Sequence, residues 1–163
     1  MVGSRKKLEL NIPATEAWEL IKDYNGMTKW RPTVAKSEII EGVDNSIGCV
    51  RKLTFLNGPI LYEKLLDYDS SKMMIVYDIH KIENGSFPVS SYKATLQIES
   101  FDSNKSVLVW KSKFKRTIRA RIPVQKEMTK KRWTWLIKIF PIYKIYFHGY
   151  LSYARATRNS YIL

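Results

Sequence analysis

Apolar and polar residues alternate along most of the first 115 residues of the chain. Alternate side chains of a strand share a face, so this period predicts half-buried β-strands. Clusters of turn-forming residues interrupt the alternation, for example at Asn57-Gly58-Pro59. The pattern predicts seven strands, at residues 6–12, 34–41, 47–56, 60–69, 73–82, 89–101 and 106–115. Short connections predict that neighbouring strands in this series pair antiparallel.

Helical spacing occurs in two other places. Between the first two strands we expect a helix at about 16–24, with Thr15 as its N-cap. Beyond residue 115, apolar residues recur at helical spacing and predict one or two terminal helices, broken near Pro141. A curved antiparallel sheet has one face that must be covered. We expect a helix over 143–163 to cover it and to leave an internal cavity.

Three polar residues occupy positions that the alternation assigns to the apolar face. Arg51 takes its place in a series with Ile47, Cys49, Leu53 and Phe55. Glu63 lies between Leu61 and Leu65, and Tyr92 heads a series with Ala94, Leu96 and Ile98. A charge that faces inward is costly unless it is paired or solvated in a cavity. The pattern therefore predicts one internal polar site that contains Arg51, Glu63 and Tyr92.

A shared face for Arg51 and Glu63 constrains the turn between their strands. An even number of loop residues would put the two side chains on opposite faces of the sheet, whereas an odd number puts them on the same face. We predict a three-residue loop, Asn57-Gly58-Pro59, which places Glu63 opposite Leu53 and diagonal to Arg51.

Five segments give the chain a family resemblance: IPATEAWELIKDY, KWRPTV, IGCVRKLTF, YEKLLDYD and PVSSYKATL. Over residues 5–115 the chain resembles the superfamily of START lipid-binding domains, birch-pollen-allergen-like proteins and polyketide cyclases. Within it, the chain is most similar to bacterial polyketide-cyclase/dehydrase-like proteins and plant lachrymatory-factor synthases. The resemblance implies an α+β helix-grip fold, in which a seven-stranded antiparallel sheet curves around a C-terminal helix. Those synthases use an Arg, a Glu and a Tyr, which match Arg51, Glu63 and Tyr92.

We therefore expect a small hydrophobic molecule to bind in an internal cavity, with cofactor-free proton transfer of the cyclase, dehydratase or lyase type. Glu63 would act as base or acid, Arg51 would hold an oxyanion or keep Glu63 ionised, and Tyr92 would donate a hydrogen bond to a developing oxyanion. The expected ligand-binding walls are Trp30, Leu53, Phe55, Tyr77, Leu96 and Trp110. Three alternatives remain open: a buried ion pair kept for structure, a non-catalytic carrier of a lipid or other hydrophobic ligand, and a membrane-surface or interaction protein that acts through the basic, aromatic C-terminal segment.

No cofactor or metal is expected. The chain has two histidines and one cysteine, and their spacing matches no metal motif. His80 falls on the outward side of its strand and is expected at the surface. Cys49 alone cannot form an internal disulfide, and no signal-peptide or bilayer-spanning run is evident, so we expect a cytoplasmic protein.

The net charge of +13 is concentrated in the last third of the chain. Residues 1–112 hold 15 Lys and Arg against 14 Asp and Glu, whereas residues 113–163 hold 13 against 1. We expect one domain, with a strand-rich body at 5–115, a basic segment at 116–142 and a terminal helix at 143–163. Relatives in the superfamily usually end in a more acidic helix, so the basic segment departs from the pattern that the resemblance implies.

Three interpretations of the basic segment stay open. It can be a solvated helix face. It can be a surface that weakly attracts anionic membranes, without specific nucleic-acid recognition. In the third interpretation, residues 116–141 are translated one nucleotide out of register, which requires an open neighbouring frame in the coding DNA.

Overall fold

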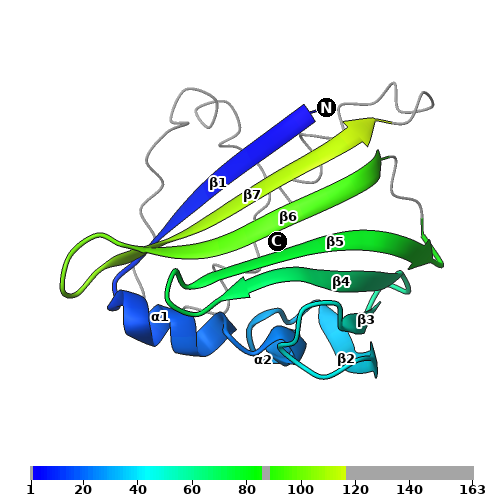
Figure 1. The fold of residues 1–163 in the computed structure, drawn as a ribbon, viewed down its shortest axis with the longest axis horizontal. Helices are drawn as coiled ribbons and strands as arrows, with labels where there is room; N and C mark the ends of the chain where they lie inside the picture. Colours follow the sequence, from blue (N-terminus) through cyan, green and yellow to red (C-terminus); the bar gives the residue numbers. More distant parts are fainter. Residues whose placement is uncertain (1, 86–88, 117–163) are drawn as a thin grey trace, which may run out of the picture.

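A computed structural model describes residues 2–85 and 89–116 of the protein, and in these residues seven strands form one antiparallel sheet (Figure 1). The strand order is β1-β7-β6-β5-β4-β3-β2, so the chain meanders from β2 to β7 and β1 joins the β7 edge. The strands are β1 (Val2–Leu10), β2 (Val34–Glu41), β3 (Val50–Phe55), β4 (Ile60–Asp69), β5 (Met74–Glu83), β6 (Val89–Ser100) and β7 (Ser106–Arg116). The predicted seven-stranded antiparallel sheet is confirmed.

Three short helical elements connect β1 to β2, namely α1 (Ala14–Ile21), the 3-10 turn η1 (Tyr24–Gly26) and α2 (Met27–Trp30). Figure 1 shows α1 and α2 together below the strands, with α2 beside β2. The predicted start of the first helix is wrong. Pro13 is the N-cap and its carbonyl accepts the Ala17 N–H at 3.0 Å, so Thr15 lies inside the first turn and caps nothing.

Two strand boundaries also differ from the prediction. β1 begins at Val2 rather than residue 6, because it pairs with β7 along its whole length, from Val2 opposite Phe114 to Leu10 opposite Ser106. β3 begins only at Val50. Gly48 has a φ of +92° and turns the chain just before the strand. Ile47, which we expected to point inward, is therefore 68% exposed.

The apolar face of the sheet forms the core with α1. Trp18 on this helix contacts the ring of Tyr68, with the ring centroids 5.8 Å apart, and the Tyr68 hydroxyl donates to the Lys22 carbonyl at 3.0 Å. Buried residues occur at alternate positions of the inner strands, as predicted, among them Leu53, Leu65, Tyr77, Ala94, Leu96, Ile98 and Leu108. On β5 and β7 the intervening Val76, Val107 and Val109 are buried as well. The alternation thus correctly identifies the inner face.

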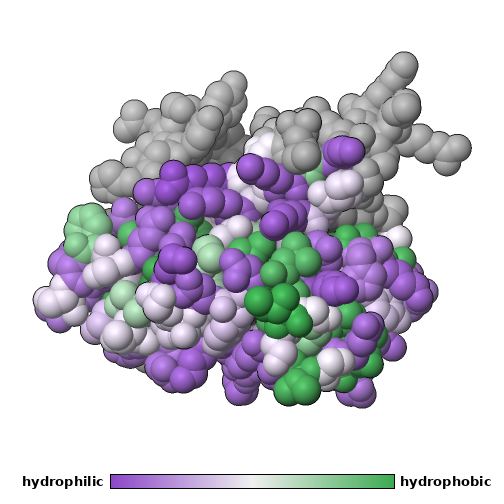
Figure 2. Space-filling model, in the orientation of Figure 1, coloured by the Kyte–Doolittle hydropathy of each residue, from purple (hydrophilic) through white to green (hydrophobic). Residues whose placement is uncertain are grey.

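The outer surface is mainly polar. Figure 2 shows polar residues over most of one face of the molecule, with apolar residues exposed in smaller groups. Most of the exposed large apolar side chains lie in or beside the connections between strands: Ile40, Val43, Ile47, Leu56 and Phe101. None of the helices in residues 2–85 and 89–116 has the length and hydropathy of a bilayer-spanning segment.

Beyond Arg116, our predictions concern residues outside the described part of the chain. These predictions are the basic segment, the terminal helix over 143–163 and the cavity that this helix would close. The described residues supply the sheet and its inner face, against which the candidate site is built.

Candidate functional site

The β3–β4 hairpin places Arg51 directly opposite Glu63. The last cross-strand pair is Thr54 with Ile60, so residues 55–59 separate the paired positions instead of the predicted three-residue loop Asn57-Gly58-Pro59. The Phe55 N–H donates to the Pro59 carbonyl at 2.9 Å. This odd-numbered connection puts both side chains on the inner face, as expected. The predicted register is wrong by two residues, because Leu53 pairs with Leu61 and not with Glu63. Alternation fixes which face a residue occupies but not its partner across the ladder.

Arg51 and Glu63 form a buried ion pair. Arg51 donates twice to the same carboxylate oxygen, from Nη2 to Oε2 at 2.6 Å and from Nε to Oε2 at 3.0 Å. The two side chains are only 3% and 1% exposed. Within residues 2–85 and 89–116, no group donates a hydrogen bond to the second oxygen, Glu63 Oε1. A buried acceptor without a donor costs about 1–3 kcal/mol, and more when it carries charge.

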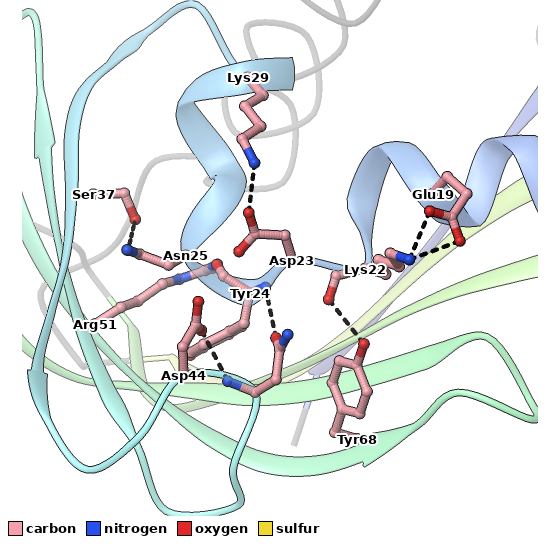
Figure 3. A network of polar contacts seen from close by, with 11 residues as sticks. Glu19, Lys22, Asp23, Tyr24, Asn25, Lys29, Ser37, Asp44, Arg51 and Tyr68 are labelled. Carbon is pink, nitrogen blue, oxygen red and sulfur yellow. Dashed lines mark hydrogen bonds and ion pairs between the residues drawn. The ribbon is translucent and has the colours of Figure 1, made fainter.

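Tyr24 contacts Arg51 from the opposite side of the site. Its backbone carbonyl accepts a hydrogen bond from Arg51 Nη1, and its ring centroid lies 3.8 Å from Arg51 Cζ. Figure 3 shows the Arg51 side chain reaching the Tyr24 segment between two helical turns. The ring of Tyr77, on β5, lies 5.6 Å from the same Cζ atom. The guanidinium is therefore enclosed by a carboxylate, a carbonyl and two aromatic rings.

The β2–β3 connection holds Tyr24 in place. Asn45 has a φ of +59°, and its Oδ1 accepts the Tyr24 N–H at 2.8 Å. A second hydrogen bond holds the same 3-10 turn to β2, from the Ser37 hydroxyl to Asn25 Oδ1 at 2.8 Å. Sequence analysis missed Tyr24 as a site residue. Its helical spacing with Trp18 and Ile21 and its place in the IPATEAWELIKDY segment do not predict the contact with Arg51, which spans 27 residues of chain.

Burial and charge act in opposite directions on the pKa of Arg51. Desolvation alone lowers the pKa, but the attraction and hydrogen bonding of Glu63 outweigh it and raise the pKa above its ordinary value. For Tyr24, burial instead raises the pKa, although the charge of Arg51 opposes this rise. The Tyr24 side chain is thus a neutral phenol at physiological pH. Its Oη atom is buried and has no hydrogen-bond partner among the described residues.

The structure places Tyr92 on the same inner face but further from the ion pair. Tyr92 is opposite Ile79, which is in turn opposite Glu63, so two strand spacings, or roughly 10 Å, separate the backbones. The Tyr92 side chain is buried, and its ring stacks on Phe114 with centroids 6.2 Å apart. The structure therefore brings Arg51 and Glu63 into contact, whereas Tyr92 lies two strands away from Glu63 on the same face.

Five of the six residues expected to line a ligand site are buried: Trp30 on α2, and Leu53, Tyr77, Leu96 and Trp110 on the inner face of the sheet. Phe55 is half-buried at the end of β3, and the Arg31 guanidinium lies 4.8 Å from its ring centroid. Leu96 and Trp110 are cross-strand neighbours. All six pack in or against the main core cluster, and their contact with a ligand stays a prediction.

His80 and Cys49 are further reactive side chains among the described residues. His80 is exposed, as predicted, with its Nδ1 3.7 Å from Asp78 Oδ1. Cys49 is buried, and desolvation raises the pKa of its thiol, which keeps it protonated. In residues 2–85 and 89–116, no three His, Cys, Asp or Glu side chains gather as a metal site would require.

Solved structures share this fold. The chain is similar to an uncharacterised protein from Bacillus thuringiensis, with a TM-score of 0.71 and 24% identity over 86% of this chain and 99% of that chain. It is also similar to the protein XoxI from Bacillus cereus, with a TM-score of 0.71 and 22% identity over 85% and 92% of the two chains. A START superfamily protein from Mycobacterium smegmatis gives a TM-score of 0.66 and 11% identity over 84% and 92%.

These likenesses establish the START-like, helix-grip fold that the sequence predicted. A family model provides the stronger finding. The model for "Polyketide cyclase / dehydrase and lipid transport" matches residues 1–139, beyond residue 115, where the resemblance noted from the sequence ended. The chain belongs to this polyketide cyclase/dehydrase and lipid transport family.

Proposed function

We propose that the protein binds a small hydrophobic molecule against the inner face of the sheet, with the Arg51–Glu63 pair as its polar contact. One observation supports this most strongly. A buried carboxylate on an apolar face has both Arg51 bonds on Oε2 and no donor to Oε1 within the described residues. The family's description, which names both cyclase/dehydrase enzymes and lipid transport, fits a site of this kind.

A purely structural role accounts less well for this arrangement. Taking two charges out of water is costly, and apolar residues of similar volume are often at least as stabilising as a buried ion pair. A pair kept for stability would be expected to satisfy both carboxylate oxygens, because an unsatisfied acceptor forfeits part of the gain. Glu63 instead keeps one oxygen available on a face lined by apolar side chains such as Leu53 and Leu65.

The same geometry can support proton transfer. Arg51 fixes the carboxylate through Oε2, which leaves Oε1 to accept a proton from an O–H or an acidic C–H of the ligand. The proton can return to another atom of the same molecule, so the reaction needs neither an oxidant nor a cofactor. Tyr92 is the proposed donor to an oxygen on which negative charge develops at the far end of the ligand. The corresponding reaction class is a cyclisation, dehydration or other lyase-type rearrangement.

A carrier without chemistry is the second candidate, and the lipid-transport part of the family description favours it. A carrier would use the same apolar face and the same polar contact but would return the molecule unchanged. The two candidates therefore share a site and differ in what Glu63 does there.

The variant Glu63→Gln separates these candidates. The compound extracted from purified wild-type protein is first identified by mass spectrometry. It is then incubated with each protein and followed by proton NMR. Conversion by the wild type alone, with binding retained in the variant, supports the enzyme. Binding by both without conversion supports the carrier. A variant that binds and turns over like the wild type but melts at a lower temperature would contradict the proposal and leave a structural pair.

A further inference from the structure

Glu63 Oε1 and Tyr24 Oη are two buried polar atoms at one site, and neither has a hydrogen-bond partner among the described residues. Glu63 is 1% exposed and Tyr24 is also 1% exposed. Both residues bind the same guanidinium, Glu63 through its Oε2 and Tyr24 through its carbonyl and ring face. The two atoms therefore belong to one cluster, which the roles proposed above use only in part.

The two atoms have complementary hydrogen-bonding roles. An ionised carboxylate oxygen only accepts hydrogen bonds, whereas a neutral phenol can donate one. Burial raises the pKa of Tyr24, so its proton is retained over the physiological range. A molecule that satisfies both atoms must donate a hydrogen bond to Glu63 and accept a hydrogen bond from Tyr24. A hydroxyl group does both.

The charge of the site excludes acids as preferred ligands. The Arg51 guanidinium already has a carboxylate at 2.6 Å, so the pair carries no net charge. A carboxylate or phosphate head group would bring a second anion close to Glu63 Oε1, and like charges in a buried site repel strongly. A neutral head group avoids this repulsion and also fills the missing hydrogen bond.

We infer that the protein selects a neutral, hydroxyl-bearing hydrophobic molecule, whose hydroxyl donates to Glu63 Oε1 and accepts from Tyr24 Oη. Tyr24 is thus a binding residue in its own right, in addition to its contacts with Arg51. This inference rests on the proposed function, because it names the ligand class of the same site. It also distinguishes this site from one that carries fatty acids.

Three small molecules with the same alkyl chain test the inference by calorimetric titration of the full chain: n-octanol, octyl methyl ether and octanoate. At about pH 8 octanoate is ionised. The ether accepts a hydrogen bond but donates none. We expect n-octanol to bind about tenfold more tightly than either of the others, the change that one well-made hydrogen bond can produce.

Three variants assign this preference to its atoms. Tyr24→Phe keeps the ring over Arg51 and removes only the hydroxyl, and should weaken n-octanol binding by about fivefold. Tyr62→Phe is the matched control, because the Tyr62 hydroxyl binds Glu83 at 3.0 Å on the outer face, and this variant should bind n-octanol as the wild type does. Glu63→Gln leaves the charge of Arg51 without its counter-ion, so its octanoate affinity should rise relative to n-octanol.

The outcomes also distinguish this inference from the proposed function. Equal affinity for all three molecules, or equal behaviour of Tyr24→Phe and Tyr62→Phe, would overturn the inference and leave a hydrophobic binding site. Tighter binding of octanoate than of n-octanol by the wild type would overturn it in favour of an acid carrier. If none of the three molecules binds and nothing co-purifies, both the inference and the proposed function fail.

Discussion

Two ion pairs of the same length lie on opposite faces of the sheet. Arg51 and Glu63 meet at 2.6 Å on the inner face, and Lys81 and Glu83 meet at 2.6 Å on the outer face. The inner side chains are 3% and 1% exposed, whereas the outer ones are 56% and 37% exposed. The distance is equal, so the surroundings decide what each pair does. Water can replace either partner of the outer pair, but nothing comparable can replace a partner of the inner pair.

The largest expected effect comes from removing one inner charge. Arg51→Met leaves the Glu63 carboxylate buried without its counter-ion, and we expect a loss of about 3–5 kcal/mol in the free energy of unfolding. Urea denaturation followed by circular dichroism measures this loss. A variant as stable as the wild type would show that the inner pair is as well solvated as the outer one.

Replacing both inner charges should restore most of that stability. Arg51→Met combined with Glu63→Leu removes the desolvation cost of both groups, and such exchanges are often neutral or stabilising. We expect the unfolding midpoint of the double variant to return close to that of the wild type. A double variant as unstable as Arg51→Met would mean that the pair itself stabilises the fold, which favours a structural role.

Alkaline pH provides a second test of the inner face. The pKa of Tyr24 in the folded protein lies above its ordinary value of 10.0, because burial disfavours the phenolate. The stabilisation from the neutral phenol is complete below the unfolded pKa and is lost as the pH rises above it, by up to about 1.4 kcal/mol per pH unit. Tyr24→Phe lacks this group and should lose less stability than the wild type between about pH 9 and 11. The free energy of unfolding of each protein is measured by urea denaturation across this pH range. An equal loss in wild type and Tyr24→Phe would contradict this account.

Asn45→Gly should have a smaller effect. Glycine keeps the positive φ of this position without strain, so the change isolates the loss of the Tyr24 N–H bond to Oδ1. We expect a destabilisation of about 1 kcal/mol in urea denaturation. The control Asn57→Gly lies in the β3–β4 connection and makes no bond to Tyr24, so it should reduce the stability less than Asn45→Gly does.

The smallest effect is expected on the outer face. Lys81→Gln removes a charge from an exposed pair, and we expect no measurable change in the melting temperature. A clear decrease would mean that the outer pair is more than a solvated contact, and the contrast between the two faces would then disappear.

The sequence revealed which side chains face inward but not how they meet. Alternation correctly put Arg51, Glu63 and Tyr92 on the buried face, because the strand period is fixed by backbone geometry. The β3–β4 register was wrong because odd-numbered loops of different lengths all satisfy the same alternation. Alternation also does not predict that Tyr92 lies two strands from Glu63.

Contacts that span long stretches of chain were beyond the sequence pattern. Tyr24 reaches Arg51 from a 3-10 turn, and Asn45 holds Tyr24 from the β2–β3 connection. Asn45 belongs to no periodic series, and the helical spacing of Tyr24 with Trp18 and Ile21 predicts burial but not a contact with Arg51. The prediction of Thr15 as the N-cap was also wrong. Residue type favours Thr as an N-cap, but the helix begins at Ala14 with Pro13 as its N-cap.

The central claim is that the inner ion pair serves a bound molecule. Native mass spectrometry of the full chain, purified without detergent, tests it most directly when wild type and the Arg51→Met/Glu63→Leu variant are compared. The account predicts a wild-type spectrum with the added mass of a small neutral compound and a bare spectrum for the folded double variant. A bare wild-type spectrum, or the same adduct at equal occupancy on both proteins, would contradict it.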